Sequence, residues 1–385
     1  MPVTPSVPSA TSALDRPLAG ITVLDVSRML PGAVLARSLI DLGARVIKIE
    51  DPRMGDLMRL APPLVGGIGV GYCIYYRGAE SVGLDLREPA GVAALRLLAS
   101  RADVLIESFR PGTMARYGLP LESLRADNPG LVVCSLPGFL GGAEVGHDLN
   151  FTALTGLLRQ VTPHGIPALQ LADVTAGLLA GSAILAALLL RARTGQGSML
   201  CQPLLAGPLP FVTWAWAEAA AGGGGMAQRM LGGAAPAYRC YHCADGLELA
   251  VGCLEPKFWI SFASVVGKPE LASTGLDTGP TGDETAAAMQ AWLLTQPRAH
   301  WLALTAGHSL PVWPVHGLED AAREPALAAL TEATPMPDGS TLRGPGPALP
   351  GLGQTPTSPA PALGAHTHSV LTEFGASPEL LASLT

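Results

Sequence analysis

Two side chains of types that commonly move protons, His147 and Asp173, lie 26 residues apart. An imidazole and a carboxylate can each be poised near neutral pH by burial and by neighbouring groups. Taking a proton from one face of a carbon atom and returning a proton to the opposite face requires two such groups. Residue type and spacing alone do not pair them, because Asp173 could instead cap the apolar helix that follows it and His147 could be structural.

The elements that must position these side chains follow an alternating order of strand and helix. Gly32–Leu42 and Pro89–Leu98 have helical patterns, and each lies between apolar segments typical of strands. This order predicts a Rossmann-like α/β fold with a mostly parallel sheet, in which ligands bind beyond the carboxyl ends of the strands. The glycines do not form the G-x-G-x-x-G fingerprint, so the sequence does not support a nicotinamide cofactor. The predicted strands are Ile21–Val26, Arg45–Glu50, Ser81–Leu86, Ala102–Glu107 and Gly130–Leu136.

The chain is expected to divide into a large domain and a smaller α/β domain. A run of four glycines, Gly222–Gly225, predicts a flexible junction between a large domain at 17–221 and a small domain at 226–330. Residues 331–385 are predicted to form an extended return segment, rich in Pro and Gly, that ends in a helical stretch. Residues 1–16 lack the features of a secretory signal and are expected to be a disordered lead-in.

Regular elements are also predicted in the second half of the chain. The longest apolar run, Val174–Leu190, starts directly after Asp173 and is expected to be a buried helix rather than a membrane span. In the small domain, Leu247–Gly252 has the pattern of a strand. Helices are predicted at Pro256–Val266 and Glu284–Gln296.

Composition argues against several classes of partner. A formal net charge of −7 and a pI near 5.6 disfavour a nucleic-acid or anionic-membrane binder, which would need a basic surface. The six cysteines lack the dense spacing of a secreted disulfide scaffold, so a reducing, cytoplasmic location is expected. Cys240 and Cys243 have no second pair at ligand spacing, and therefore no metal site is predicted.

Ordered motifs along nearly the whole chain resemble those of the family III CoA transferase superfamily, which includes the α-methylacyl-CoA racemases. Such a resemblance implies an interlocked homodimer in which the C-terminal helix packs back onto the N-terminal domain. It also implies that the large domain binds coenzyme A (CoA). The matching segments are Pro17–Val26, Leu39–Glu50, Gly55–Asp56, Ser81–Arg87, Ala102–Gly112, Gly146–Asn150, Leu171–Asp173, Ile184–Leu188, Thr194–Gly197 and Ala362–Leu371.

The resemblance also assigns catalytic roles. In the racemases, the Gly-His-Asp motif carries one base and the aspartate at the start of the next long helix carries the other, which here are His147 and Asp173. The family pairs the histidine with a glutamate, which corresponds to Glu255 in the segment Ala250–Phe258. Without the resemblance, Glu255 could simply occupy the start of a helix.

A CoA-binding cleft follows from the same resemblance, with the CoA thioester as substrate and no separate cofactor. Two positions depart from the family pattern. Asp51 stands where a basic residue is common after the second strand, with Arg53 two positions later, and Phe151 stands where a tyrosine is usual. The residues that the resemblance places at the cleft are Leu84, Arg87, Phe109, Arg110, Pro111, Gly112 and Arg116.

Three functions are compatible with these residues. The favoured one is a racemase or epimerase of 2-methylacyl-CoA thioesters that works through an enolate, with His147 and Asp173 as the two bases. The alternative is a family III CoA transferase in which Asp173 is the nucleophile that forms a mixed anhydride. A CoA-binding protein without turnover is the third. The acyl group, the direction of epimerisation and the pathway are not encoded in any of these motifs.

Overall fold

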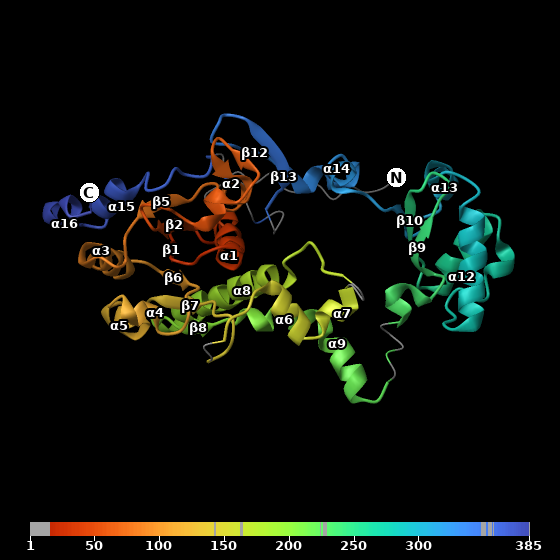
Figure 1. The fold of residues 1–385 in the computed structure, drawn as a ribbon, viewed down its shortest axis with the longest axis horizontal. Coiled ribbons are helices and arrows are strands. Elements are labelled where there is room, and N and C mark those ends of the chain that lie inside the picture. The colour runs from red at the N-terminus through yellow and green to blue at the C-terminus, as the bar shows by residue number, and fades with distance from the viewer. Residues whose placement is uncertain are drawn as a thin grey trace. The chain divides into compact units, whose positions relative to one another are not determined.

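The computed structural model describes residues 16–384 except 142–143, 162–164, 224, 226–228, 348–351, 353–355 and 357 (Figure 1). Residues 1–15 of the predicted lead-in at 1–16 lie outside the described residues. Two compact units are present, one within Met1–Pro210 and Pro325–Thr385 and the other at Phe211–Glu324. The first boundary thus precedes the glycine run. Helix α9 (Leu209–Ala220) buries only Val212, so it does not pack into the core of the large unit.

The large unit is built on six parallel strands in the order β5-β2-β1-β6-β7-β8. This is the strand order of a doubly wound Rossmann sheet, and it confirms the predicted fold class. Strand β8 was missed because it is only three residues long and follows directly on a helix and a glycine-rich turn. The strands are β1 (Thr22–Asp25), β2 (Arg45–Glu50), β5 (Glu80–Gly83), β6 (Val104–Glu107), β7 (Val132–Ser135) and β8 (Met199–Cys201).

Apolar residues alternate between the two faces of this sheet and form a separate core on each. Val23 of β1 belongs to the core that includes α1 (Leu30–Asp41) and α8 (Leu171–Thr194). Its neighbour Leu24 belongs to the opposite core, which includes α3 (Pro89–Ala99). Successive strand side chains point to opposite faces, so one buried strand supplies both cores.

Helix α8 packs against α1 through a face of small residues. A Cβ atom added to Gly177 would lie 2.6 Å from the carbonyl oxygen of Pro31, so this close approach requires glycine. The prediction of a buried helix is correct for this face only, because Leu178, Leu189 and Leu190 on the other side are exposed. Among the described residues, α8 alone is long and apolar enough to cross a membrane by length and composition, a criterion that core helices also meet.

The C-terminal segment returns to the far edge of the sheet, where α15 (Thr367–Glu373) contacts β5 and α16 (Pro378–Ala382) contacts α3 (Figure 1). The N–H of Gly83 donates to Oγ1 of Thr367 at 2.9 Å, and Val370 and Leu371 enter the same core as α3. Earlier in the same segment, within the large unit, a hairpin of β12 (Thr331–Pro335) and β13 (Thr341–Pro345) forms in a stretch predicted to be extended.

The second unit has a three-stranded antiparallel sheet with its own core. The strand order is β11-β10-β9, from β9 (Tyr238–His242), β10 (Glu248–Gly252) and β11 (Val312–Pro314). Its core contains Trp259 and Met289 from α11 (Pro256–Val265) and α12 (Pro280–Leu293), together with Trp301 from α13 (Arg298–Thr305). This unit therefore has a hydrophobic core separate from the two cores of the large unit.

A buried polar network beneath the end of β1 holds the loop that follows this strand. Lys48 of β2 is fully buried, and its Nζ lies 3.4 Å from Asp25 and 3.3 Å from Asp56 while it donates to the carbonyl oxygen of Ser27. Burial alone would lower the pKa of Lys48, but the surrounding carboxylates raise it, so the amine stays protonated. Oδ2 of Asp56 also accepts from the N–H of Met29 at 3.3 Å.

Replacing Lys48 by methionine is expected to lower the free energy of unfolding by about 3–5 kcal/mol, because the Asp25 and Asp56 carboxylates would remain buried without their cation. Urea denaturation followed by circular dichroism measures the change. Lys257→Met is the matched control at an exposed lysine, where a change within about 0.5 kcal/mol is expected. An equal, small effect of both substitutions would contradict a supporting role for Lys48.

Candidate functional site

Strands β1 and β6 are neighbours in the sheet, and the strand order runs in opposite directions from them: β1 is followed by β2 on one side and β6 by β7 on the other. Doubly wound folds bind ligands at such a topological switch point. The loops that leave these two strands are held together, because the N–H of Arg28 donates to Oγ of Ser108 at 2.9 Å. Met29 has a positive φ of 64°, which is unusual for a residue with a side chain. Strained backbone of this kind clusters at functional sites.

His147 and Asp173 line one cavity of about 250 Å³ at this switch point, here called the His147 pocket. The structure thus brings together the two side chains that the sequence nominated for proton transfer. The cavity is further lined by Arg28 and Met29 from the loop after β1. Its lining also includes Phe109, Arg110 and Pro111, three of the residues predicted for the CoA cleft.

Two helix starts position His147 and Asp173. His147 immediately precedes α6 (Asp148–Leu154), and its N–H donates to Oδ1 of Asn150 at 3.0 Å. Oδ1 of Asp148 accepts from the backbone N–H of Asp173 at 3.0 Å, so it joins the start of α6 to the first turn of α8. This contact fixes the backbones of both candidate bases relative to one another.

Phe151 supports the loop that carries His147. Its ring is fully buried and packs edge-on against Phe139 at 5.4 Å between ring centroids. A Cβ atom on Gly146 would come within 2.9 Å of the same ring. The departure from tyrosine therefore places an apolar ring in an apolar contact, and its role here is packing.

The environment of Asp173 raises the pKa of its carboxyl group toward neutral pH. Burial is the largest cause and the nearby Asp148 carboxylate the next, and together they raise the pKa of Asp173 to about 6, although His147 opposes them. A group with this pKa is mostly ionised at pH 7 yet can be reprotonated readily. Asp173 thus has the acidity expected of a residue that alternates between base and acid.

Asp148→Asn is expected to move the acidic limb of the pH–rate profile to lower pH. The substitution removes a negative charge beside Asp173, so the Asp173 carboxyl loses its proton more easily and its pKa falls below about 6. If Asp173 is a catalytic base, it acts only when ionised, so activity would then persist further into acid. Measurement of kcat/KM between pH 4.5 and 8 checks this, and a limb that stays in place or moves upward would contradict it.

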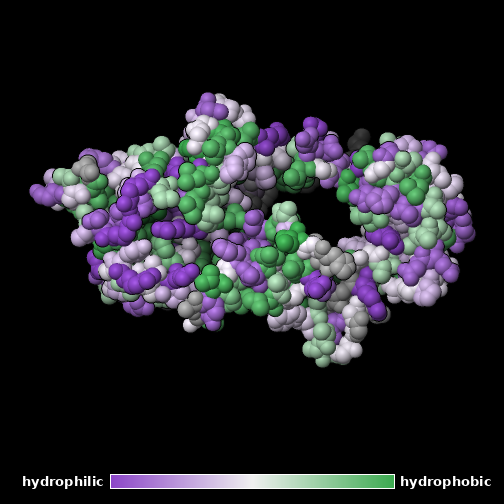
Figure 2. All heavy atoms as spheres, viewed as in Figure 1, coloured by the Kyte–Doolittle hydropathy of each residue, from purple (hydrophilic) through white to green (hydrophobic). Residues whose placement is uncertain are grey.

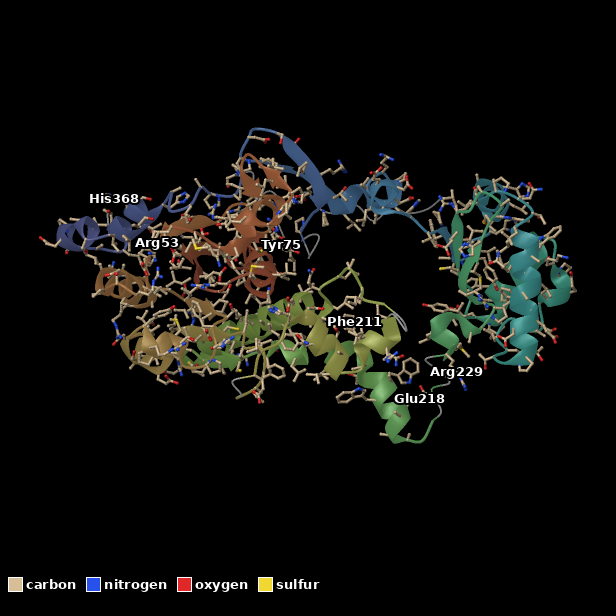
Figure 3. All side chains as sticks on the ribbon, viewed as in Figure 1. Arg53, Tyr75, Phe211, Glu218, Arg229 and His368 are labelled. Carbon is tan, nitrogen blue, oxygen red and sulfur yellow. The ribbon has the colours of Figure 1, made fainter. Side chains whose placement is uncertain are left out.

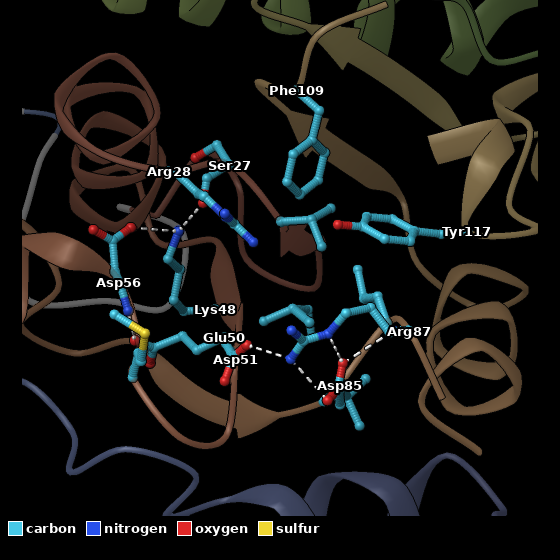
Figure 4. Close-up of a pocket in the computed structure, with 16 residues that line it drawn as sticks. Ser27, Arg28, Lys48, Glu50, Asp51, Asp56, Asp85, Arg87, Phe109 and Tyr117 are labelled. Carbon is cyan, nitrogen blue, oxygen red and sulfur yellow. Dashed lines mark hydrogen bonds and ion pairs between the residues drawn. The ribbon is translucent and has the colours of Figure 1, made fainter. Parts of the chain in front are cut away.

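A second cavity of about 300 Å³, the Lys48 pocket, lies beyond the carboxyl ends of β1, β2 and β5 (Figure 4). It shares Arg28 and Phe109 with the His147 pocket, so the two cavities adjoin. Leu84 and Arg87, predicted for the CoA cleft, line it as well. Tyr117 approaches Phe109 edge-on, with 6.1 Å between ring centroids, and gives this cavity an aromatic wall.

A third cavity of about 360 Å³, the Glu107 pocket, adjoins the other two through Phe109. Arg110, Pro111 and Gly112 line it, as predicted for the cleft, and most of its other walls are apolar. Burial raises the pKa of the Glu107 carboxyl at its base. Arg116 lines none of these three cavities; it lies in α4 (Thr113–Arg116) and donates to Oγ1 of Thr113 at 2.9 Å.

Glu255 lies in the second unit, directly before α11. This is the helix-start position that the sequence allowed for it, and its partnership with His147 stays a prediction. Cys240 is exposed and Cys243 is buried. In the part of the chain that the structure describes, no three His, Cys, Asp or Glu side chains gather into a group able to hold a metal ion.

Sequence reasoning missed several residues of the site. Arg28 lines both the His147 and Lys48 pockets, and the rule that ligands bind after strand ends pointed to its loop. Asp148 lies inside the Gly-His-Asp motif, but its hydrogen bond to Asp173 depends on how α6 meets α8. Lys48 and Tyr117 carried no such signal, since a lysine within a strand segment and a tyrosine after a short helix occur in many folds, and the sequence does not show that Lys48 is buried.

The fold and the site together define an α/β protein with a Rossmann-like sheet and a cavity at its switch point that a histidine and an aspartate line. The model of CoA-transferase family III matches residues 18–367, and the chain belongs to this family. It is therefore an enzyme of the superfamily that comprises the family III CoA transferases and the acyl-CoA racemases, which act on acyl-CoA substrates.

Known relatives carry both activities in their names. The chain is 32% identical to alpha-methylacyl-CoA racemase of Homo sapiens, with 94% of each chain covered. It is 31% identical to acetyl-CoA:oxalate CoA-transferase of Acetobacter aceti, over 81% of this chain and 84% of that protein. A crystal structure of a CaiB/BaiF family protein from Brucella suis is similar with a TM-score of 0.79 and 28% identity, covering 93% of this chain and 99% of that one.

Proposed function

We propose that this enzyme racemises 2-methylacyl-CoA thioesters by proton transfer at C2. The observation that carries the proposal is that His147 and Asp173 line one cavity while the pKa of Asp173 is raised to about 6. Two groups that can each hold or release a proton near pH 7 are what the reaction requires. A transferase needs the carboxylate but not a second base.

In the proposed reaction, ionised Asp173 takes the C2 proton and leaves an enolate of the thioester. Protonated His147 then delivers a proton to the opposite face of C2, so the configuration is inverted and no atom is gained or lost. The reverse reaction exchanges the two roles, with neutral His147 as the base. Glu255 is proposed as the partner that fixes the tautomer of His147 and raises its basicity.

The three adjoining cavities suggest how a CoA thioester would lie. Its reacting carbon belongs in the His147 pocket, and its nucleotide needs a neighbouring cavity with charge and aromatic surface. The Lys48 pocket offers Arg28 for phosphate together with Phe109 and Tyr117 for the adenine ring. The largely apolar Glu107 pocket lacks this combination.

An assembly of two copies and a cytoplasmic location are further parts of the proposal. Each unit exposes hydrophobic side chains on the face seen in Figure 2. Leu189 of α8 and Trp214 of α9 are each 65% exposed in the single chain, which a homodimer interface would explain. All six cysteines are free, as expected in a reducing compartment.

The test is proton NMR of a single enantiomer of 2-methylacyl-CoA incubated with the enzyme in D₂O, with a free carboxylate acceptor present. Loss of the C2 proton signal together with racemisation would support the proposal. Transfer of CoA to the acceptor while C2 keeps its proton would instead establish the transferase, with Asp173 as nucleophile. Tight binding of the thioester with neither reaction would indicate a binding protein.

A further inference from the structure

A cluster of four charged side chains lies at the part of the Lys48 pocket that the His147 pocket does not share. Asp51, Asp85 and Arg87 line the cavity there, and Arg53 pairs with both aspartates from outside its lining. Arg87 donates from Nη2 to Asp51 at 3.0 Å and from Nε to Asp85 at 2.7 Å (Figure 4). Arg53, labelled in Figure 3, donates from Nη2 to Asp85 at 3.0 Å and also contacts Asp51. Each arginine thus has both aspartates as partners. We call these four residues the rim cluster.

The rim cluster pairs two arginines with two aspartates. Burial alone would raise the pKa of Asp51, but the N–H groups of Arg53 and Met54 and the charge of Arg53 hold it below its usual value. Two guanidinium groups and two carboxylates then sum to a net charge of zero. Besides Arg87, two cations line the pocket: Lys48 is buried between Asp25 and Asp56, whereas Arg28 stacks on Phe109 with 5.2 Å to the ring centroid.

This distribution of charge would attract the diphosphate of CoA more strongly than its 3′-phosphate. The argument assumes the proposed function, in which the thioester lies in the His147 pocket and the nucleotide in the Lys48 pocket. The diphosphate of CoA is nearer the thioester and would meet Arg28, which lines both cavities. The 3′-phosphate is at the far end and would meet the rim cluster. There it would be attracted by two arginines and repelled by two aspartates at similar range.

We propose that Asp51 is a specificity-determining residue that makes this enzyme nearly indifferent to the 3′-phosphate of its CoA substrate. Exposed ion pairs are individually weak, so a phosphate could displace one of them. Displacement does not remove the carboxylate charge, however, and the net attraction stays small. The enzyme should therefore use thioesters of 3′-dephospho-CoA about as well as those of CoA itself.

The experiment compares kcat/KM for the 2-methylacyl thioesters of CoA and of 3′-dephospho-CoA at constant ionic strength. The expected ratio in the unmodified enzyme is within about threefold of one. In Asp51→Asn the ratio should rise about tenfold or more in favour of CoA, because Arg53 and Arg87 then share a single carboxylate, Asp85, and the rim cluster carries a net positive charge that attracts the phosphate. Asp85→Asn should shift the ratio in the same direction and serves as the second variant if Asp51→Asn does not fold.

Asp127→Asn is the matched control, since Asp127 pairs with Arg96 at 2.6 Å on the surface and lines none of the three cavities. Its ratio should equal that of the unmodified enzyme. A ratio above about thirty in the unmodified enzyme, no rise in either rim variant, or an equal rise in Asp127→Asn would overturn the proposal. Calorimetric affinities for CoA and 3′-dephospho-CoA give the same comparison without catalysis, so they separate this inference from the racemase assignment.

Discussion

Replacement of Asp173 by asparagine is expected to reduce racemisation of 2-methylacyl-CoA by about a hundred- to ten-thousand-fold, the usual contribution of a positioned acid/base group. An amide has nearly the same shape as the carboxylate but neither accepts nor releases a proton near pH 7. The hydrogen bond that the backbone N–H of Asp173 donates to Asp148 does not involve the Asp173 side chain and should survive the substitution. Polarimetry of a single enantiomer of the thioester measures the loss.

The same substitution would also stop a transferase, so it tests whether Asp173 belongs to the reaction rather than which reaction occurs. Asp127→Asn, at a surface ion pair, is the control and should keep full activity. An Asp173→Asn enzyme with an unchanged circular dichroism spectrum and at least a third of normal activity would remove Asp173 from the mechanism. The residue would then be a helix-start aspartate with a shifted pKa.

His147→Ala is expected to separate the two chemistries. In a two-base racemase, loss of the imidazole should slow racemisation by about a hundred- to ten-thousand-fold. Exchange of the C2 proton with D₂O could continue from the enantiomer on which Asp173 acts, since that step needs only the carboxylate. NMR in D₂O with each enantiomer in turn would therefore show exchange that depends on configuration.

A transferase would respond differently to the same change. Asp173 would still attack the thioester carbonyl, so transfer of CoA to a carboxylate should stay within about tenfold of normal. His308→Ala, at an exposed histidine of the second unit, is the matched control and should leave either reaction unchanged. Undiminished racemisation in His147→Ala would contradict a direct role for His147.

The helices and strands of the large unit could be predicted because apolar patterns, glycines and prolines indicate the same element boundaries. Buried strands such as Arg45–Glu50 are short segments with several β-branched residues that end at a glycine or a charged turn, and helices such as α3 begin at a proline. Short edge strands such as β8 and β11 escaped, since three residues do not establish a period. Exposure of the outer face of α8 also escaped, because an apolar run does not reveal which of its faces finds a partner.

The sequence indicated which residues belong to the candidate site but not the contacts between them. Residue types and the Gly-His-Asp context nominated His147 and Asp173, and the structure places both in one cavity. The contact of Asp148 with Asp173 and the pairing of Asp51 with Arg87 join residues 25 and 36 positions apart. Such contacts depend on how helices and strands pack in three dimensions, so no local sequence pattern predicts them.

The return of the chain to β5 has a consequence for synthesis on the ribosome. The hydrogen bond from Gly83 to Thr367 joins residues that are 284 positions apart. At about 5–20 residues per second, roughly 15–60 s pass between translation of the strand and translation of the helix that covers it. The apolar surface formed by β5 and α3 stays exposed to solvent during that time. Premature termination before residue 367 would therefore release a chain with an open core, a natural substrate for chaperones and proteases.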